Sequence, residues 1–307
     1  MHLWEELKHL IKGSVAPDAP LAPFSTFRIG GPAQCLAEPL NAEDIIAIKQ
    51  FALDHSLPLL LLGNGSNVLI ADEGWKGIVV NLEKGFTNLA FDNGILSVGA
   101  GVKMAIFVDY AIRNRRKGVE MLAGIPATIG GAVWMNAGCY GGETADTLLD
   151  VDLIRNNTVI RLAKEACDFS YRHSGFQKGD IIIGARFEMG EGEPEELRAI
   201  KLKHLKHRND VQPVNQPNCG SVFKNPRPRY SAELIESVGL KGTRIGGAEI
   251  STKHANFIVN VANASAHDVV ALINLARQKV FEATGIVLEP EVQLIGFSKY
   301  PLENLPT

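Results

Sequence analysis

Residues 62–69 read Leu62-Gly63-Asn64-Gly65-Ser66-Asn67-Val68-Leu69. The apolar run Leu57 to Leu62 leads into the two glycines and is typical of a buried strand, and a strand resumes directly at Val68 to Ile70. Glycine in such a tight loop lets backbone N–H groups approach a ligand closely, as phosphate binding requires. The pattern therefore predicts two strands joined by a candidate cofactor loop.

Glycine gathers at turns elsewhere too, and the chain has 30 glycines among 307 residues, above the usual share of about 7%. The other glycine loops are Gly30-Gly31, Gly124 to Gly131, Asn136 to Gly142 and Gly246-Gly247. The sequence does not contain the familiar nucleotide-binding motifs. Gly63-x-Gly65 and Gly99-x-Gly101 each begin like a dinucleotide fingerprint, but Val68 and Met104 occupy the position of its third glycine. No Gly-Lys dipeptide exists for a Walker A loop. Taken singly, each loop is more typical of a structural turn than of a ligand-binding site. Together they favour a phosphate-bearing cofactor outside the Rossmann class.

Length and composition describe an ordinary soluble chain of two or three packed units. The formal charge of −3 gives no general basic surface for nucleic acid. Four cysteines without a CxxC pair argue against a zinc or iron–sulfur site, so no metal is expected. Acidic residues near the N-terminus do not suit a signal peptide, and the longest apolar run is far below the roughly 20 residues that cross a bilayer. We expect a cytoplasmic protein with no membrane partner.

Helical and strand periodicities alternate along the chain and predict an α+β fold. The predicted helices are Leu3 to Ile11, a helix capped by Asn41 and ending near His55, Met104 to Ile112, Glu191 to Gln212, Ser231 to Val238 and His267 to Thr284. The predicted strands include Gly77 to Leu82, Gly94 to Val98, several between Asp150 and Glu188, Ser221 to Asn225, Asn256 to Asn260 and Leu288 to Ile295. Pro213 and Pro217 follow the charged fourth helix and mark the preferred domain boundary.

Six motifs in a fixed order extend this interpretation. They are residues 25–33 (STFRIGGPA), 62–69 (LGNGSNVL), 124–132 (GIPATIGGA), 171–174 (YRHS), 220–226 (GSVFKNP) and 288–292 (LEPEV). Together they closely resemble the UDP-N-acetylenolpyruvoylglucosamine reductase family, flavoenzymes of peptidoglycan precursor synthesis. The resemblance extends from about Phe24 to Gly296.

The resemblance implies a domain organisation. Residues 1–197 would form an FAD-binding unit of the vanillyl-alcohol-oxidase (PCMH) type, made of α+β subdomains at about 1–76 and 77–197. Residues 198–307 would form an α+β substrate-binding domain whose last strand returns to the flavin site. No obligate protein partner is evident.

The resemblance also implies a reaction in two stages on bound FAD. NADPH first reduces the flavin, and the enolpyruvyl ether of UDP-N-acetylglucosamine then takes the hydride at its terminal methylene carbon. By motif position, Ser221 is the expected proton donor for the adjacent carbon. Arg172 and Glu291 are expected to polarise the enolpyruvyl group, and Tyr171, Lys224 and Asn225 to contact the substrate.

The cofactor residues implied by the same motifs lie in the glycine loops. They are Leu62, Gly63, Asn64, Gly65, Ser66, Asn67, Gly124, Ile125, Pro126, Ala127, Gly130, Gly131, Ala137 and Gly138.

The residue types suit this chemistry. Hydride addition to an enol ether needs a cation to stabilise the developing negative charge, which a guanidinium such as that of Arg172 supplies. Ser221, Phe223 and Asn225 share one face of a predicted strand, and Glu289 shares a face with Glu291 in the last predicted strand. Spacing does not choose between the two glutamates, and only the family pattern favours Glu291.

Two features show where this chain agrees with one subclass of the family and where it departs from the family pattern. The segment between Arg172 and Ser221 is short, and in this the chain resembles the subclass that lacks an inserted loop with a substrate-covering tyrosine. Cys219 departs from the expected small inert residue, and is either a thiol whose alkylation stops activity or, as we favour, a small buried side chain.

Two other functions remain open from sequence. One is a related flavin oxidase or dehydrogenase with another acceptor, against which Gly220-Ser221 and Glu291 argue. The other is a non-catalytic nucleotide-sugar binding protein that has kept the fold.

Overall fold

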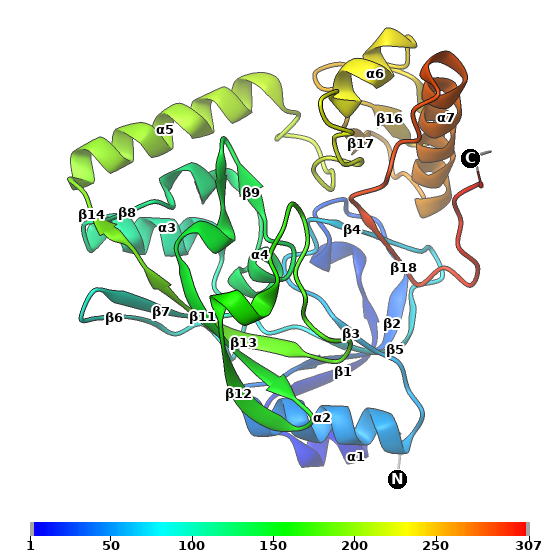
Figure 1. The fold of residues 1–307 in the computed structure, drawn as a ribbon. Coiled ribbons are helices and arrows are strands. Elements are labelled where there is room, and N and C mark those ends of the chain that lie inside the picture. The colour runs from blue at the N-terminus through cyan, green and yellow to red at the C-terminus, as the bar shows by residue number, and fades with distance from the viewer. Residues whose placement is uncertain (1–2, 305–307) are drawn as a thin grey trace. The chain divides into compact units, whose positions relative to one another are not determined.

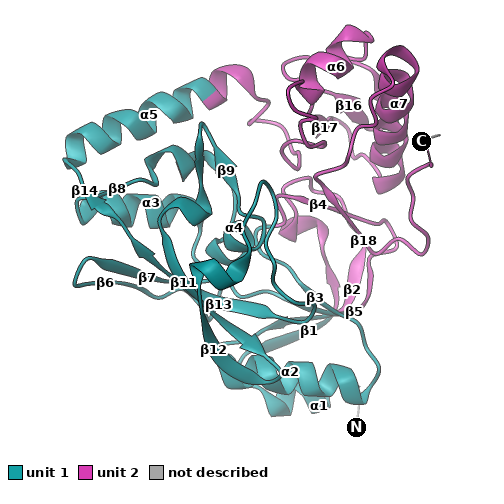
Figure 2. Ribbon diagram, in the orientation of Figure 1, with its two compact units in different colours: residues 1–17, 35–64, 77–207 teal, residues 18–34, 65–76, 208–307 magenta. Residues whose placement is uncertain are grey.

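The structure, a computed structural model, describes residues 3–304. Within them the chain divides into two compact units (Figure 2). Unit 1 comprises residues 1–17, 35–64 and 77–207, and unit 2 comprises residues 18–34, 65–76 and 208–307. Residues 18–34 and 65–76 thus group with the C-terminal part, whereas the predicted cofactor domain included them. The predicted ranges 1–197 and 198–307 stay a prediction.

The N-terminal part of the chain forms two helices, α1 (Leu3–Leu10) and α2 (Ala42–Asp54), and the strands of the first sheet. Its strand order is β1-β2-β5-β3, with bounds Ser14–Pro20, Pro32–Glu38, Trp75–Val80 and Leu59–Leu61. The prediction for α2 is confirmed, since the Asn41 side chain accepts from the Asp44 N–H at 2.9 Å. The apolar face of α2 is buried through Ile45, Ile48 and Phe51. The parallel pair β3 and β5 holds the start of the first glycine loop in the sheet.

A second, antiparallel sheet lies in unit 1 (Figure 1). Its order is β12-β11-β13-β7-β6, with bounds Thr158–Ala163, Leu148–Arg155, Ile181–Glu188, Ile95–Gly99 and Leu89–Asp92. Helices α3 (Met104–Arg113) and α4 (Ile129–Trp134) share its core, and α4 packs against β13 and β7. This packing is what fixes α4, at whose start the second glycine loop ends.

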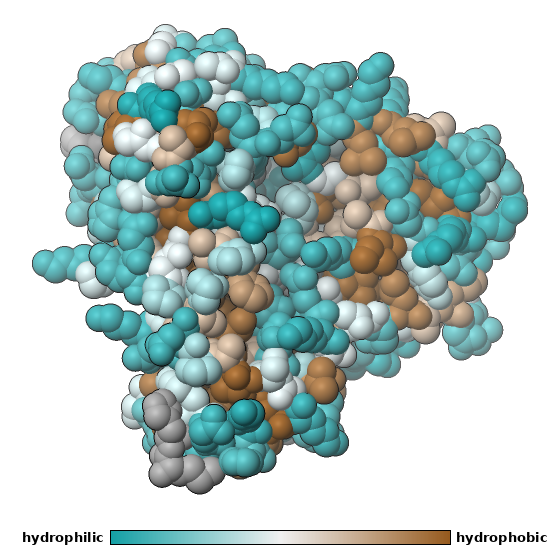
Figure 3. Space-filling model, turned by 180° about the vertical axis from the view of Figure 1, so that it is seen from behind, coloured by the Kyte–Doolittle hydropathy of each residue, from teal (hydrophilic) through white to brown (hydrophobic). Residues whose placement is uncertain are grey.

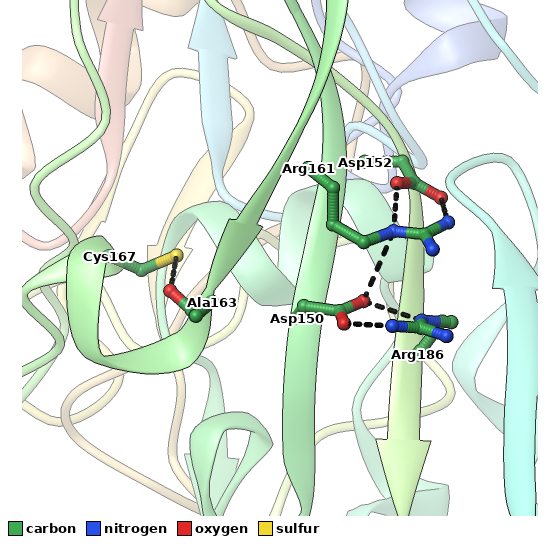
Figure 4. Close-up of polar contacts among 6 residues, drawn as sticks. All are labelled: Asp150, Asp152, Arg161, Ala163, Cys167 and Arg186. Carbon is green, nitrogen blue, oxygen red and sulfur yellow. Dashed lines mark hydrogen bonds and ion pairs between the residues drawn. The ribbon is translucent and has the colours of Figure 1, made fainter.

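An ionic ladder crosses this sheet (Figure 4). On β11, Asp152 accepts two hydrogen bonds from Arg161 of β12, at 2.7 and 2.8 Å. Asp150 accepts two from Arg186 of β13 and also lies 3.6 Å from Arg161. Such bidentate pairs specify strand register. The ladder therefore belongs to the architecture of the sheet.

The remaining elements of unit 1 are short, except for one helix. The two-stranded pairs are β9 (Gly138–Cys139) with β10 (Gly142–Glu143), and β8 (Arg116–Lys117) with β14 (Gly190–Glu191). The 3-10 helices are η2 (Glu120–Gly124), η3 (Thr144–Asp146) and η4 (Lys164–Cys167), with η1 (Ala22–Phe24) in unit 2. Helix α5 (Pro194–Val211) confirms the helix predicted before Pro213.

Unit 2 contains an antiparallel sheet, β15 (Arg244–Ile245), β16 (Ala248–Ile250) and β17 (Ile258–Asn260), with helices α6 (Ser231–Ser237) and α7 (Ala266–Thr284). The α7 prediction is confirmed, and the helix begins at a Ser265/Asp268 capping box and ends at Gly285, whose φ is +72°. A parallel pair joins β4 (Val68–Ile70) to β18 (Gln293–Ile295).

Two strand predictions in unit 2 need correction. Residues 221–225 do not form a strand and are joined to their neighbours by an isolated bridge between Phe223 and Pro290. Of the strand predicted at Leu288–Ile295, only the last three residues are β18. The reason is that Pro290 lacks an N–H donor and the segment before it has no continuous ladder partner.

On the face shown in Figure 3, hydrophilic residues cover most of the surface and apolar residues form small groups among them. Among residues 3–304, no helix combines the length and apolar character needed to cross a membrane. In the same range no group of three His, Cys, Asp or Glu side chains could hold a metal ion. Cys35, Cys167 and Cys219 are buried thiols, and Cys139 is half-buried.

Candidate active site

The first glycine loop leaves the sheet at Leu62, whose N–H donates to the Val80 carbonyl at 2.9 Å. The buried Asn81 donates its amide to the Leu62 carbonyl at 3.0 Å and so holds the start of the loop. Gly65 has a φ of +60°, and a Cβ there would lie 2.0 Å from the Phe24 carbonyl oxygen, so only glycine fits. Asn81 is not among the residues predicted from sequence, although a polar residue at the end of an apolar strand is a usable signal.

The second loop lies against the first within unit 1. Asn64 donates its amide to the Pro126 carbonyl at 2.6 Å. A Cβ at Gly63 would lie 2.5 Å from Oγ1 of Thr128, so the absence of a side chain permits this approach. The predicted cofactor residues 62–64 and 124–131 therefore form one neighbourhood, with Thr128 as a further member that sequence reasoning did not single out.

The third loop joins this neighbourhood through α4. The Ala137 N–H donates to the Ala132 carbonyl at 2.8 Å, which places Ala137 and Gly138 directly after the helix. Arg172 donates from Nη2 to the Gly138 carbonyl at 2.7 Å, and its guanidinium lies over the Tyr171 ring, 4.9 Å from the centroid. The structure thus brings Arg172 to the third predicted cofactor loop.

Residues 65–67, the end of the first loop, belong to unit 2. The Thr26 N–H donates to the Gly65 carbonyl at 3.1 Å, and the Thr26 hydroxyl donates to the Asn218 carbonyl at 2.7 Å. Asn67 contacts the backbone of Glu291, to whose carbonyl its amide donates at 3.1 Å. This part of the loop is therefore tied to the segments that carry Ser221 and Glu291.

The Ser221 segment is held by a buried asparagine. Asn256 accepts the Phe223 N–H at 2.9 Å and returns its amide to the Phe223 carbonyl at 2.8 Å, and its own carbonyl accepts the Val222 N–H. Gly220, with a φ of +77°, turns the chain just before the half-buried Ser221. Asn256 supplies the backbone partners that a sheet neighbour would otherwise give, and nothing in the sequence marks this asparagine beyond its residue type.

Glu291 lies beside this segment. Its N–H donates to the Val222 carbonyl at 2.8 Å, so the residue next to Ser221 is paired with Glu291. Burial raises the pKa of the Cys219 thiol to about 12, and the charge of Glu291 contributes to that rise. The Glu291 carboxylate therefore lies near the segment that carries Ser221.

The other predicted substrate residues have partners inside unit 2. Lys224 forms an ion pair with Glu289 at 2.6 Å, and the Glu289 side chain is 68% exposed. The Asn225 amide oxygen accepts the Ser231 N–H, the first N–H of α6, at 3.0 Å. Because an exposed ion pair contributes little to stability, Lys224 can exchange Glu289 for a ligand anion at small cost.

The predicted catalytic residues are divided between the units. Arg172 belongs to unit 1 with most of the cofactor residues, whereas Ser221 and Glu291 belong to unit 2. Ser221 and Glu291 are brought together through Val222, and Arg172 is joined to Gly138.

The glycine loops fit a phosphate-bearing cofactor such as FAD. Within residues 3–304, the backbone N–H groups of residues 63–67 donate to no other protein group. Gly131 is exposed, and a Cβ there would meet only Thr128 Oγ1, at 3.6 Å. A phosphate or flavin needs N–H groups that have no other acceptor, and glycines let the ligand come close to them because they carry no side chain.

Comparison with known proteins adds two family models. Residues 33–162 match an FAD binding domain, and residues 212–295 match the C-terminal domain of UDP-N-acetylenolpyruvoylglucosamine reductase. The first match contains all the predicted cofactor residues. The second contains Ser221 and Glu291. The fold class predicted from sequence is confirmed.

Individual relatives agree over almost the whole chain. The UDP-N-acetylenolpyruvoylglucosamine reductase of Synechococcus sp. (strain WH7803) is 44% identical over 292 residues, covering 93% of this chain and 94% of the relative. That of Halalkalibacterium halodurans is 39% identical, covering 96% and 98%. The crystal structure of the Thermus caldophilus reductase superposes with a TM-score of 0.81 at 34% identity and covers 93% of this chain and all of that one.

Proposed function

Since the chain belongs to the UDP-N-acetylenolpyruvoylglucosamine reductase family, we propose that it reduces the enolpyruvyl group of UDP-N-acetylglucosamine-enolpyruvate with NADPH on bound FAD. The product is UDP-N-acetylmuramate, a peptidoglycan precursor. When bound, FAD supplies the chemistry of taking a hydride from NADPH and giving it to the terminal methylene carbon. The protein's own residues must then hold the substrate and deliver one proton to the adjacent carbon.

Arg172 is the proposed stabiliser of the enolpyruvyl carboxylate. A planar guanidinium matches a carboxylate, and its positive charge favours the electron density that hydride addition places there. The bond from Arg172 to the Gly138 carbonyl and the stacking on Tyr171 restrict the orientation of the guanidinium. This restriction supports a role in positioning charge rather than a solvated surface arginine.

Ser221 is the proposed proton donor, with Glu291 beside it. The observation that carries this assignment is the pairing of Glu291 with Val222, which puts a carboxylate near the segment of a half-buried serine. A serine hydroxyl is a weak acid, so it protonates carbon only when geometry and a developing carbanion favour the transfer. Glu291 is favoured over Glu289, because Glu289 is mostly exposed and is paired with Lys224.

The remaining assignments belong to the same proposal. The residues proposed to hold FAD are those of the three glycine loops, and Tyr171, Lys224 and Asn225 are proposed to contact the substrate. We place the enzyme in the cytoplasm, without a nucleic-acid, membrane or obligate protein partner. The cofactor range 1–197 and the substrate range 198–307 are proposed as functional domains.

Anaerobic stopped-flow absorbance of the flavin tests the proposal. The purified protein should show a flavin band at about 450 nm that NADPH bleaches and that one equivalent of the enolpyruvyl sugar restores. Absence of the band would favour a non-catalytic nucleotide-sugar binding protein. Reoxidation by oxygen but not by the sugar would favour a flavin oxidase.

A further inference from the structure

Asn136 is a buried polar residue two positions after the end of α4. Its side chain is 1% exposed, and its backbone is in the left-handed region, with a φ of +43°. Asparagine tolerates this region better than most residues, but a buried amide has to find partners for its donors and its acceptor. The partners of Asn136 therefore show what the residue holds together.

The Asn136 amide joins two segments of unit 1. Nδ2 donates to the Glu143 carboxylate at 2.8 Å and to the Ser170 carbonyl at 3.1 Å. Oδ1 accepts the Ala145 N–H at 3.1 Å. Glu143 lies on β10, the partner of β9, while Ser170 begins the turn that carries Arg172. The Asn136 side chain thus links the β9–β10 hairpin to residues 170–173, here called the arginine turn.

These contacts close a ring around Arg172. Ser170 and His173 exchange two backbone hydrogen bonds of 3.1 Å, which close the turn. Arg172 has a φ of +56° in that turn and donates to the Gly138 carbonyl. Gly138 is two residues after Asn136. The Arg172 guanidinium is held by the Gly138 carbonyl, and the backbone of its turn is held at Ser170 by the Asn136 amide. Asn136 therefore connects both anchor points.

We propose that Asn136 is a positioning residue that sets the orientation of Arg172 toward the enolpyruvyl carboxylate. This inference rests on the proposed function, because it assumes that Arg172 acts on that carboxylate. Loss of the amide breaks the bonds that join the Ser170 carbonyl to the Glu143 carboxylate through Asn136, while the His173 N–H still donates to Ser170, so the arginine turn shifts as a unit relative to Gly138. A displacement of about 1 Å at a reacting group can slow a reaction about 100-fold.

The main test variant is Asn136→Gly, because glycine accepts the left-handed backbone and the substitution removes the whole side chain with its amide. Asn136→Asp is the second variant, since it keeps the shape and the acceptor but loses the donors. Either variant can be assayed if the other fails to fold. In stopped-flow measurements, both should leave NADPH-driven flavin reduction near the wild-type rate and slow reoxidation by the enolpyruvyl sugar about 100-fold.

The matched control is Thr144→Val. Thr144 is also 1% exposed and donates its hydroxyl to the Ala137 carbonyl at 2.7 Å, that is, to the loop rather than to residues 170–173 of the arginine turn. This variant loses a comparably buried hydrogen bond, so the ratio of its two half-reaction rates should stay near wild type. A changed ratio in Thr144→Val would show general loosening of the loop and would overturn the inference.

A double-mutant cycle separates positioning from general damage. If Asn136 acts through Arg172, Asn136→Gly should not slow reoxidation further in an Arg172→Ala background. Additive losses would overturn the inference, as would normal reoxidation of both Asn136 variants. A wild-type protein that the enolpyruvyl sugar does not reoxidise would instead refute the proposed function, so the two failures are distinguishable.

Discussion

Asn67 donates its side-chain amide to the backbone carbonyl of Glu291, with 3.1 Å between Nδ2 and the oxygen. The Gln293 N–H donates in return to the Asn67 carbonyl at 2.9 Å, and β18 continues as the parallel partner of β4. A residue of the first glycine loop therefore holds the backbone of the proposed catalytic glutamate. Residues 65–67 of the first glycine loop and the segment around Glu291 are therefore parts of one local structure in unit 2.

Replacing Glu291 should be far more costly for activity than replacing Glu289. We expect Glu291→Gln to slow flavin reoxidation by the enolpyruvyl sugar about 100- to 1000-fold, because the charge proposed to polarise the enolpyruvyl group is lost. Glu289→Gln is the matched control and should change this rate little, since that carboxylate is exposed and paired with Lys224. Stopped-flow absorbance measures both rates. Equal effects of the two substitutions would contradict the assignment of Glu291.

Removing the Ser221 hydroxyl should affect only the second half of the reaction. Ser221→Ala is expected to leave NADPH-driven flavin reduction near normal and to slow reoxidation about 100- to 10,000-fold, the usual contribution of a positioned acid. Ser237→Ala, at the end of α6 in the same unit, is the control and should be nearly silent. An equal loss of rate in both half-reactions would contradict the proposed role of Ser221.

Gly131→Ala should separate flavin binding from folding. An added Cβ meets only Thr128 Oγ1, at 3.6 Å, and alanine in a helix is more stable than glycine by about 0.5–1 kcal/mol. The apoprotein should therefore unfold at an equal or higher temperature, while the flavin content of the purified protein falls. Gly63→Ala is the contrasting variant, because its Cβ would clash with Thr128 at 2.5 Å and lower both quantities. Full flavin content in Gly131→Ala would contradict the proposed FAD contact.

The Cys219 thiol should be inert in the native protein. It is 2% exposed, and burial raises its pKa from 9.0 to about 12, so almost no thiolate forms at pH 8. Iodoacetamide should leave Cys219 unlabelled and activity intact, with the half-buried Cys139 as the internal comparison in mass spectrometry. Rapid labelling of Cys219 with loss of activity would restore the alternative of a sensitive thiol.

The same thiol makes a directional contribution to the pH dependence of stability. Its pKa is higher in the folded protein than the unfolded value of 9.0. The unfolded chain therefore releases the proton first, and the contribution is fully present below pH 9 and is lost as the pH rises toward 12. Cys219→Ala should flatten this alkaline decline in urea-unfolding experiments. An unchanged decline would contradict the raised pKa.

Local sequence signals predicted those elements whose stabilising contacts lie close along the chain. Asn41 caps α2 through Asp44, and Ser265 caps α7 through Asp268, each within three residues. Both helices were placed within about two residues of their ends. The strand predicted at residues 221–225 was wrong because its backbone partners are Asn256 and the segment around Pro290, which no local pattern reveals.

By itself, the sequence determined the family motifs, the glycine positions and the α+β class, since these depend on residue type and on spacing along the chain. Only the tertiary structure showed that Glu289 pairs with Lys224 while Glu291 is held by Asn67 and Val222. It also showed that Asn136 links the Arg172 turn to the β9–β10 hairpin. The physical reason is that an unpaired donor or acceptor is costly only where water is excluded, and burial is a property of the folded chain rather than of any short segment.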